Sequence, residues 1–285
     1  MAINNLHLGQ WGSAGDMPCI YKVTICSKDK LLVRKVEGIN EWADLGLCVV
    51  KEFELSNEQS TFELQKREAM KEAKLLSQAR HRHVIKLCGT YSIGPDESSD
   101  SGESPWYGII MEEANSSLST YLKGIVDVPK SWFGCLVDTL AHIHGLGIRH
   151  RDIKPENILV VRGGKKGIPI IKLSDFGISQ AGLGRTTPTT IPALARGRSE
   201  SFCAPEVQHG STRGRAADVF SLGAVLLEIL IATSCADERT KLARIINQEG
   251  SQHYAANVEM VQQWMEEELK GKLDADWQRQ ILSLC

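Results

Sequence analysis

The stretch that decides the fold runs from His150 to Asn157 and reads HRDIKPEN. It places cationic groups, two carboxylates and an amide around one proline, a composition too polar for a core strand or helix. Asp152 offers a carboxylate for a proton, Lys154 a charge for a phosphate, and Asn157 an amide oxygen for a metal. The sequence therefore predicts a loop with a chemical role at this point.

Two further short motifs follow this loop. Ser174 to Gly177 reads SDFG and comes directly after a predicted strand, so that Asp175 is suited to Mg²⁺ and the glycine lets the backbone turn. Phe202 to Glu206 reads FCAPE and precedes a strongly apolar predicted helix. Each motif alone is weak because such short runs recur by chance, and their order and spacing carry the information.

Two charged residues upstream of the loop have both an ordinary and a functional explanation. Lys51 follows three apolar residues in a predicted strand, and it lies either on a solvated edge or in a cleft. Glu72 shares a helix face with Ala69 and Leu76. A carboxylate buried on that face needs a cationic partner. The alternative is an exposed glutamate in a charge-rich helix.

The predicted strands come mostly before the predicted helices. We expect strands over 20–36 (a hairpin), 46–55, 83–93, 106–114, 156–161 and 170–176, and helices over 56–79, 131–147, 217–232 and 257–270. This order predicts an α+β protein with two lobes. The first lobe is a small antiparallel sheet with one main helix, the second is larger and mostly helical, and the hinge falls near Glu112 to Asn115.

Composition excludes several classes of protein. The chain has 285 residues, 42% of them hydrophobic, and a net charge of -2, which gives no electrostatic reason to expect a nucleic-acid or membrane partner. The eight cysteines are scattered without metal-ligand spacing, as is typical of reduced thiols in a cytoplasmic or nuclear protein. The apolar run Val219 to Ala232 carries Glu228 and is shorter than a bilayer requires, which favours a buried helix.

Taken in order, Lys51, Glu72, HRDIKPEN, DFG and APE resemble the eukaryotic protein kinase family, of Ser/Thr type. The resemblance runs from about Ile20 to the last residue, with a tail over 1–19, a first lobe over about 20–112 and a second over about 116–285. It implies an intracellular signalling enzyme that transfers the γ-phosphate of ATP, with Mg²⁺, to Ser/Thr hydroxyls of protein substrates. It leaves the oligomeric state open.

The resemblance also implies a role for each matching residue. The implied catalytic residues are Asp152 as base, Lys154 at the transferred phosphate, and Lys51 paired with Glu72. The implied metal ligands are Asn157 and Asp175. The implied nucleotide contacts are Lys51, Val33, Val49, Met111, Glu112, Ala114 and Leu159. Asp218 would brace the catalytic loop, and a spine would stack Leu76, Leu87, His150 and Phe176.

Three features depart from the family pattern. The place expected for the glycine-rich phosphate loop holds ICSKDKLLV, which lacks glycine, although Lys28 and Lys30 offer charges there. An earlier run, Leu8 to Asp16, contains glycines, but it would require an insertion of about twenty residues before the lysine strand. Val49 stands where the family usually has alanine. The chain also ends where the family continues through two more helices, including an arginine that pairs with the glutamate of APE, here Glu206.

These departures keep two alternatives open. The first is a pseudokinase, which is a kinase-shaped module that binds nucleotide or acts as a scaffold without phosphotransfer. The second is a kinase of small molecules, which the protein-substrate character of KPEN and the long loop before APE disfavours. Gly177 to Ala204 would be the activation loop, with hydroxyl groups that are candidates for phosphorylation at Thr186, Thr187, Thr189, Thr190, Ser199 and Ser201.

Overall fold

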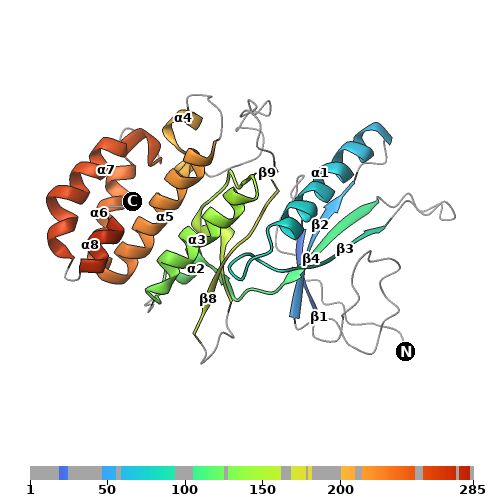
Figure 1. Ribbon diagram of the computed structural model, residues 1–285, viewed down its shortest axis with the longest axis horizontal. Coiled ribbons are helices and arrows are strands. Elements are labelled where there is room, and N and C mark those ends of the chain that lie inside the picture. Colours follow the sequence, from blue (N-terminus) through green and yellow to red (C-terminus); the bar gives the residue numbers. More distant parts are fainter. Residues whose placement is uncertain are drawn as a thin grey trace. The chain divides into compact units, whose positions relative to one another are not determined.

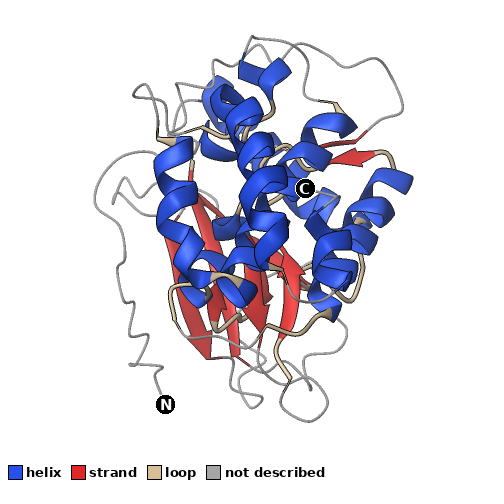
Figure 2. Cartoon of the chain, turned by 90° about the vertical axis from the view of Figure 1, so that its left-hand side faces the viewer, coloured by secondary structure: helices blue, strands red, loops and turns tan. Residues whose placement is uncertain are grey.

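The computed structural model describes residues 19–24, 47–55, 59–93, 105–124, 128–161, 168–177, 179–181, 200–208, 214–247, 253–273 and 276–282. These residues divide into two compact units, one that ends at Ala114 and one that begins at Asn115. Figure 2 distinguishes the helices from the strands.

The first unit is built on a four-stranded antiparallel sheet in the order β1-β2-β4-β3. The strands are β1 (Cys19–Thr24), β2 (Leu47–Glu54), β3 (Leu87–Ile93) and β4 (Trp106–Glu112). β2 lies inside the sheet, where Lys51 is opposite Ile20 of β1 and Ile109 of β4. The backbone of the lysine strand is therefore held on both sides.

The helix α1 (Gln59–Gln78) packs on this sheet (Figure 1). Its sequence is rich in Glu, Lys, Leu, Gln and Ala and contains no glycine or proline, which favours a continuous helix. Small residues on one face, Ala69 and Ala73, meet Tyr107 and Ile109 of β4 in a buried apolar cluster. Their small size lets the helix approach closely and fixes the face on which Glu72 lies.

The second unit is mostly helical. Its helices are α2 (Leu118–Tyr121), α3 (Ser131–Gly145), α4 (Pro205–Gln208), α5 (Arg215–Ser234), α6 (Arg239–Ile246), α7 (Val258–Trp264) and α8 (Asp276–Leu282). Its short strands are β5 (Ser116–Ser117), β6 (Ile148–Arg149), β7 (Ile158–Val161), β8 (Ile170–Leu173) and β9 (Gln180–Ala181). β5, β7 and β8 form one antiparallel sheet, and β6 pairs with β9.

Two helices form the core of this unit. In α3 the buried side chains include Phe133, Leu136, Leu140 and Ile143, which confirms the predicted apolar face. The helix ends before Gly147, whose φ of 76° is the left-handed conformation that favours glycine after a helix. By length and hydropathy alone α5 is the one described helix that could cross a membrane, but 61% of its most apolar window is buried inside the unit. This burial fits a core helix.

The predicted fold class is confirmed, with corrections at particular elements. Of the hairpin predicted over 20–36, only the first strand, β1, lies within the described residues. This strand pairs with β2, the strand that carries Lys51. The helix predicted over 257–270 is α7 followed by a π-helical turn over Met265–Leu269. The helix α8 was not predicted from the sequence.

Candidate active site

Lys51 and Glu72 form a buried ion pair in the first unit. Lys51 Nζ lies 2.9 Å from Glu72 Oε1 and 3.1 Å from Oε2, so the ammonium group contacts both carboxylate oxygens. Lys51 is 9% exposed and Glu72 4%. The same ammonium group lies 5.5 Å from the centre of the Phe53 ring, a distance at which a cation is attracted to the ring face. The predicted pairing is therefore present, and the exposed-glutamate alternative is wrong.

The other residues of the first unit with an implied nucleotide contact lie on β2, on β4 and just after β4. Val49 pairs with Met111 across the two strands, and both are half-buried. Glu112 makes two hydrogen bonds with Lys86. Its backbone N–H donates to Lys86 O, and its side chain accepts from Lys86 N. Ala114 follows, also half-buried. Val33 lies outside the described residues.

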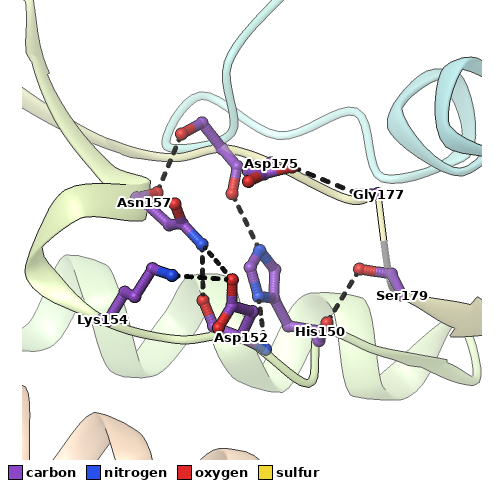
Figure 3. Close-up of polar contacts among 8 residues, drawn as sticks. His150, Asp152, Lys154, Asn157, Asp175, Gly177 and Ser179 are labelled. Carbon is purple, nitrogen blue, oxygen red and sulfur yellow. Dashed lines mark hydrogen bonds and ion pairs between the residues drawn. The ribbon is translucent and has the colours of Figure 1, made fainter. Parts of the chain in front are cut away.

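The catalytic-loop residues of the second unit form a connected polar cluster (Figure 3). Asp152 Oδ2 lies 3.1 Å from Lys154 Nζ and accepts a hydrogen bond of 2.9 Å from Asn157 Nδ2. Asn157 Nδ2 also donates to the backbone oxygen of Asp152 at 2.8 Å. Both side-chain contacts converge on Oδ2, so Oδ1 is the oxygen available in this arrangement to accept a proton from a substrate.

The register of β7 and β8 brings the loop next to the DFG motif. Ile158 pairs with Leu173, so the residues just outside this pair, Asn157 and Ser174, are adjacent. Ser174 donates twice to Asn157 O, from its backbone nitrogen and from its hydroxyl, each at 2.9 Å. Because the Asn157 amide donates to Asp152 through Nδ2, its Oδ1 remains the atom suited to bind a cation.

His150 links the loop to the residues that follow β8. Its Nε2 lies 2.9 Å from Ser174 O, and since a carbonyl oxygen only accepts, Nε2 carries the proton. The ring meets the ring of Phe176 edge-on, with centroids 4.9 Å apart. Ser179 Oγ donates to His150 O at 3.0 Å. This half of the predicted spine is present. Leu76 and Leu87 belong to the first unit.

Asp218, on α5, holds the backbone of the loop. Its Oδ2 accepts from His150 N at 2.8 Å and its Oδ1 from Arg151 N at 2.7 Å. His144 Nε2 lies 2.9 Å from the same Oδ2. Asp218 is 2% exposed, so these charge-assisted bonds form in a dry environment where they are strong. The predicted brace is present.

Two non-glycine residues of the site have left-handed backbone conformations. Arg151 has φ 71° and Asp175 has φ 62°. Such conformations cost energy in residues other than glycine, and they persist where surrounding contacts impose them. The bonds of Asp218 to the Arg151 amide, and of the Gly177 amide to Asp175 Oδ1 at 3.4 Å, are contacts of this kind.

The donor set fits a magnesium ion that also binds phosphate. Asp175 supplies a carboxylate and Asn157 an amide oxygen, which are hard oxygen ligands. Among the described residues no group of three or more His, Cys, Asp or Glu side chains is placed to hold a metal. An ion bound here would therefore complete its coordination with water and with oxygens of a phosphorylated ligand, as Mg²⁺ commonly does.

Several residues of this cluster were not singled out from the sequence. Ser174 and Ser179 make buried hydrogen bonds to Asn157 O and His150 O, and His144 binds Asp218. Serine directly before DFG was the available signal for Ser174.

Leu159, a predicted nucleotide contact, is half-buried on β7. The candidate phosphate loop at Ile25 to Val33 and the predicted activation-loop hydroxyls from Thr186 to Ser199 lie outside the described residues.

A model of the protein kinase domain family matches residues 35–281, which is most of the chain. The chain belongs to the protein kinase domain family. The resemblance read from Lys51, HRDIKPEN, DFG and APE is thereby confirmed at the level of the family.

Two relatives illustrate the similarity. Serine/threonine-protein kinase crk1 of Schizosaccharomyces pombe is 31% identical over 171 residues, covering 58% of this chain and 45% of crk1. Mitogen-activated protein kinase kinase kinase 7 of Drosophila melanogaster is 31% identical over 198 residues, covering 66% of this chain and 25% of that protein. The chain thus spans less than half the length of either kinase.

Proposed function

We propose that this chain is a protein serine/threonine kinase that transfers the γ-phosphate of ATP to Ser/Thr hydroxyl groups of protein substrates. The observation that carries the proposal is the cluster in which Lys154 and Asn157 hold one oxygen of the Asp152 carboxylate. Phosphoryl transfer demands positioning and charge stabilisation more than covalent chemistry from a protein. The named relatives, all described as protein kinases, support the same reaction.

Each residue has a defined part in this reaction. Asp152 would orient the substrate hydroxyl and accept its proton as the oxygen attacks the γ-phosphorus and the bond to the ADP oxygen breaks. Lys154, within the same cluster, would offset charge on the transferred group. Lys51, oriented by Glu72, would hold the α- and β-phosphates. Asn157 and Asp175 would hold Mg²⁺, which supplies further charge neutralisation when bound.

The pairing of β1 favours the earlier glycine run as the phosphate loop. In the family this loop leads into the strand beside the lysine strand, and that neighbour is β1. The segment that precedes β1 in the sequence contains Gly9, Gly12 and Gly15, whereas residues 25–46 separate β1 from β2. The glycine-free run then belongs to an insertion, and the main sequence argument for a pseudokinase is weakened.

The substrates and the cellular compartment are part of the same proposal. Protein substrates follow from the KPEN run and from the protein kinases that the chain resembles. We place the enzyme in the cytoplasm or nucleus, and the support is the scattered arrangement of its eight cysteines.

Transfer of labelled γ-phosphate from Mg·ATP to a generic protein substrate and to a panel of small metabolites tests this proposal. We expect label on the protein, released as phosphoserine or phosphothreonine after acid hydrolysis, and none on the metabolites. Nucleotide binding without transfer by folded protein would instead establish the pseudokinase. Label on a metabolite alone would establish a small-molecule kinase.

A further inference from the structure

Cys48 and Cys88 bring two thiol groups together in the first unit. Their sulfur atoms lie 4.0 Å apart, although 40 residues separate the two cysteines in the sequence. Cys48 is 1% exposed, and Cys88 is half-buried, so the pair is reached from solvent on the side of Cys88. No local spacing signals such a pair, because strand pairing alone brings it together. The proposed phosphotransfer gives neither thiol a part.

The sheet holds both thiols on the face opposite α1. Ile109 of β4 belongs to the cluster that packs against α1, and successive residues of a strand point to opposite faces. Ile110 therefore faces away from this helix, and it packs with Cys48, Val50 and Cys88. The pair lies among apolar side chains on paired strands, so its geometry is set before any ligand arrives.

The position of β4 disfavours a direct disulfide between the two thiols. Cys48 is on β2 and Cys88 on β3, and β4 lies between these strands. Two strand spacings amount to about 9.6 Å. A disulfide usually joins Cα atoms no more than about 6.8 Å apart. Closing an S–S bond would therefore require β2 and β3 to move together.

A metal ion between the sulfur atoms requires no such movement. Cys88 falls where the register of β3 and β4 shifts between Leu87 and Gly89, an irregularity of the kind that re-aims a side chain. Two metal–sulfur bonds of about 2.3 Å span about 3.8 Å at a tetrahedral angle and about 4.6 Å in a straight line. The observed 4.0 Å lies within this range, so the pair has the span of a two-thiolate metal site.

We propose that Cys48 and Cys88 form a metal site in which two thiolates hold one Cu(I) ion. Soft thiolate ligands select Cu(I) and Zn²⁺ over hard cations such as Mg²⁺. A structural Zn²⁺ site has four protein ligands, but within the residues that the structure describes no group of three or more His, Cys, Asp or Glu side chains is placed to hold a metal. Cu(I) is stable with two sulfur ligands, so the described pair suits it. The proposal does not depend on phosphotransfer by this chain.

The protonation of the pair supports metal binding. The hydrogen bond with Cys88 lowers the pKa of the Cys48 thiol, and the same bond, together with burial, raises the pKa of the Cys88 thiol. Cys48 therefore ionises first and offers the first thiolate. The second metal–sulfur bond displaces the Cys88 proton, so the affinity for Cu(I) should rise with pH.

Anaerobic titration of the reduced chain with Cu(I) held by a coloured competing chelator tests the proposal. We expect the wild type to take one more equivalent of Cu(I) from the chelator than Cys48→Ala or Cys88→Ala takes. Cu(I) should also raise Tm of the wild type by several degrees, and both variants should lose this rise. Cys235→Ala, at a half-buried cysteine of the second unit, is the matched control and should bind Cu(I) like the wild type.

The metal-free Tm of each variant reports whether it folds, and Cys88→Ser, at the more exposed position, carries the test if Cys48→Ala does not fold. Zn²⁺ at the same concentration should leave Tm of the wild type unchanged. A wild type that takes no Cu(I) from the chelator, or Cys48→Ala and Cys88→Ala variants that take as much as the wild type, would overturn the proposal. A rise in Tm with Zn²⁺ that requires both cysteines would overturn the choice of Cu(I).

Discussion

Lys51 and Glu72 form a buried ion pair, and their burial is the reason that each needs the other. Both were visible in the sequence, Lys51 in an apolar strand and Glu72 on an apolar helix face. The apolar helix face indicated only that a buried Glu72 would need a cation, and the resemblance to the kinase family named Lys51 as that cation. The contact between Lys154 and Asp152 could not be predicted, since it depends on the path of a loop with Arg151 in a left-handed conformation.

Removing the cation of this pair should destabilise the protein. Lys51→Met leaves the Glu72 carboxylate buried without its ammonium partner, and we expect a loss of about 3 kcal/mol in the free energy of unfolding. The double variant Lys51→Met/Glu72→Leu should recover most of this loss, because it removes both charges. Urea unfolding measures the difference.

Lys71→Met provides the control for this prediction. Lys71 lies on α1 in an exposed pair with Glu68, at 3.8 Å, and its loss should change stability by less than about 1 kcal/mol. An equal effect of Lys51→Met and Lys71→Met would show that the buried pair has no special place in the stability of the unit.

At the scale of elements, α5 connects the APE segment to the helices after it. Ser221 Oγ on this helix donates to Phe202 O at 2.7 Å. Glu228, two turns further on, accepts from the Tyr254 hydroxyl at 3.2 Å, and the Tyr254 amide donates to Ser201 O at 2.9 Å. The apolar periodicity of α5 predicted its burial, but these cross-links join segments distant in sequence, and no local pattern encodes them.

Glu228 should make stability depend on pH. Burial raises its pKa to about 7 from an ordinary 4.5, and Glu156 adds to the rise while the Tyr254 hydrogen bond and Arg239 oppose it. Between these values the unfolded chain ionises and the folded chain stays protonated, so stability falls as pH rises from 4.5 to 7 and is then constant. Glu228→Gln should match the wild type below pH 5 and exceed its stability by about 3 kcal/mol at pH 8.

Urea unfolding at pH 5 and pH 8 measures this difference. Glu266→Gln, at an exposed glutamate of the π-helical turn, is the control and should leave the pH profile unchanged. A Glu228→Gln variant with the same pH profile as the wild type would show that the carboxyl is not protonated in the folded protein.

The pairing of β1 with β2 leads to a test of the phosphate loop. If the glycine run before β1 is the phosphate loop, Gly12→Val and Gly15→Val should raise KM for ATP by about tenfold. Side chains at these positions would prevent the close approach of backbone amides to phosphate. Lys28→Ala and Lys30→Ala should leave KM nearly unchanged. Steady-state kinetics at varied ATP provides the measurement. A raised KM for Lys28→Ala and Lys30→Ala, with an unchanged KM for the glycine variants, would show that the phosphate loop is Ile25–Val33.

At the scale of the whole molecule, the order of motifs predicted the class of fold and the residues of each unit. The strands β2, β3 and β4 and the helices α1, α3 and α5 fall where apolar periodicity indicated. The partner of β1 was not predictable, because residues 25–46 separate it from β2 and strand pairing over such a distance is set by the tertiary structure. α8 was missed because its helical pattern spans only seven residues.

We propose that the Asp152 carboxylate takes the proton of a Ser/Thr hydroxyl during transfer from Mg·ATP. The most direct measurement compares the rate of γ-phosphate transfer to a protein substrate by the wild type, by Asp152→Asn and by Asp138→Asn, which changes an exposed carboxylate on α3. We predict that Asp152→Asn lowers the rate by about a hundredfold or more at unchanged thermal stability. Asp138→Asn should retain the wild-type rate. Equal rates for the wild type and Asp152→Asn would contradict the account.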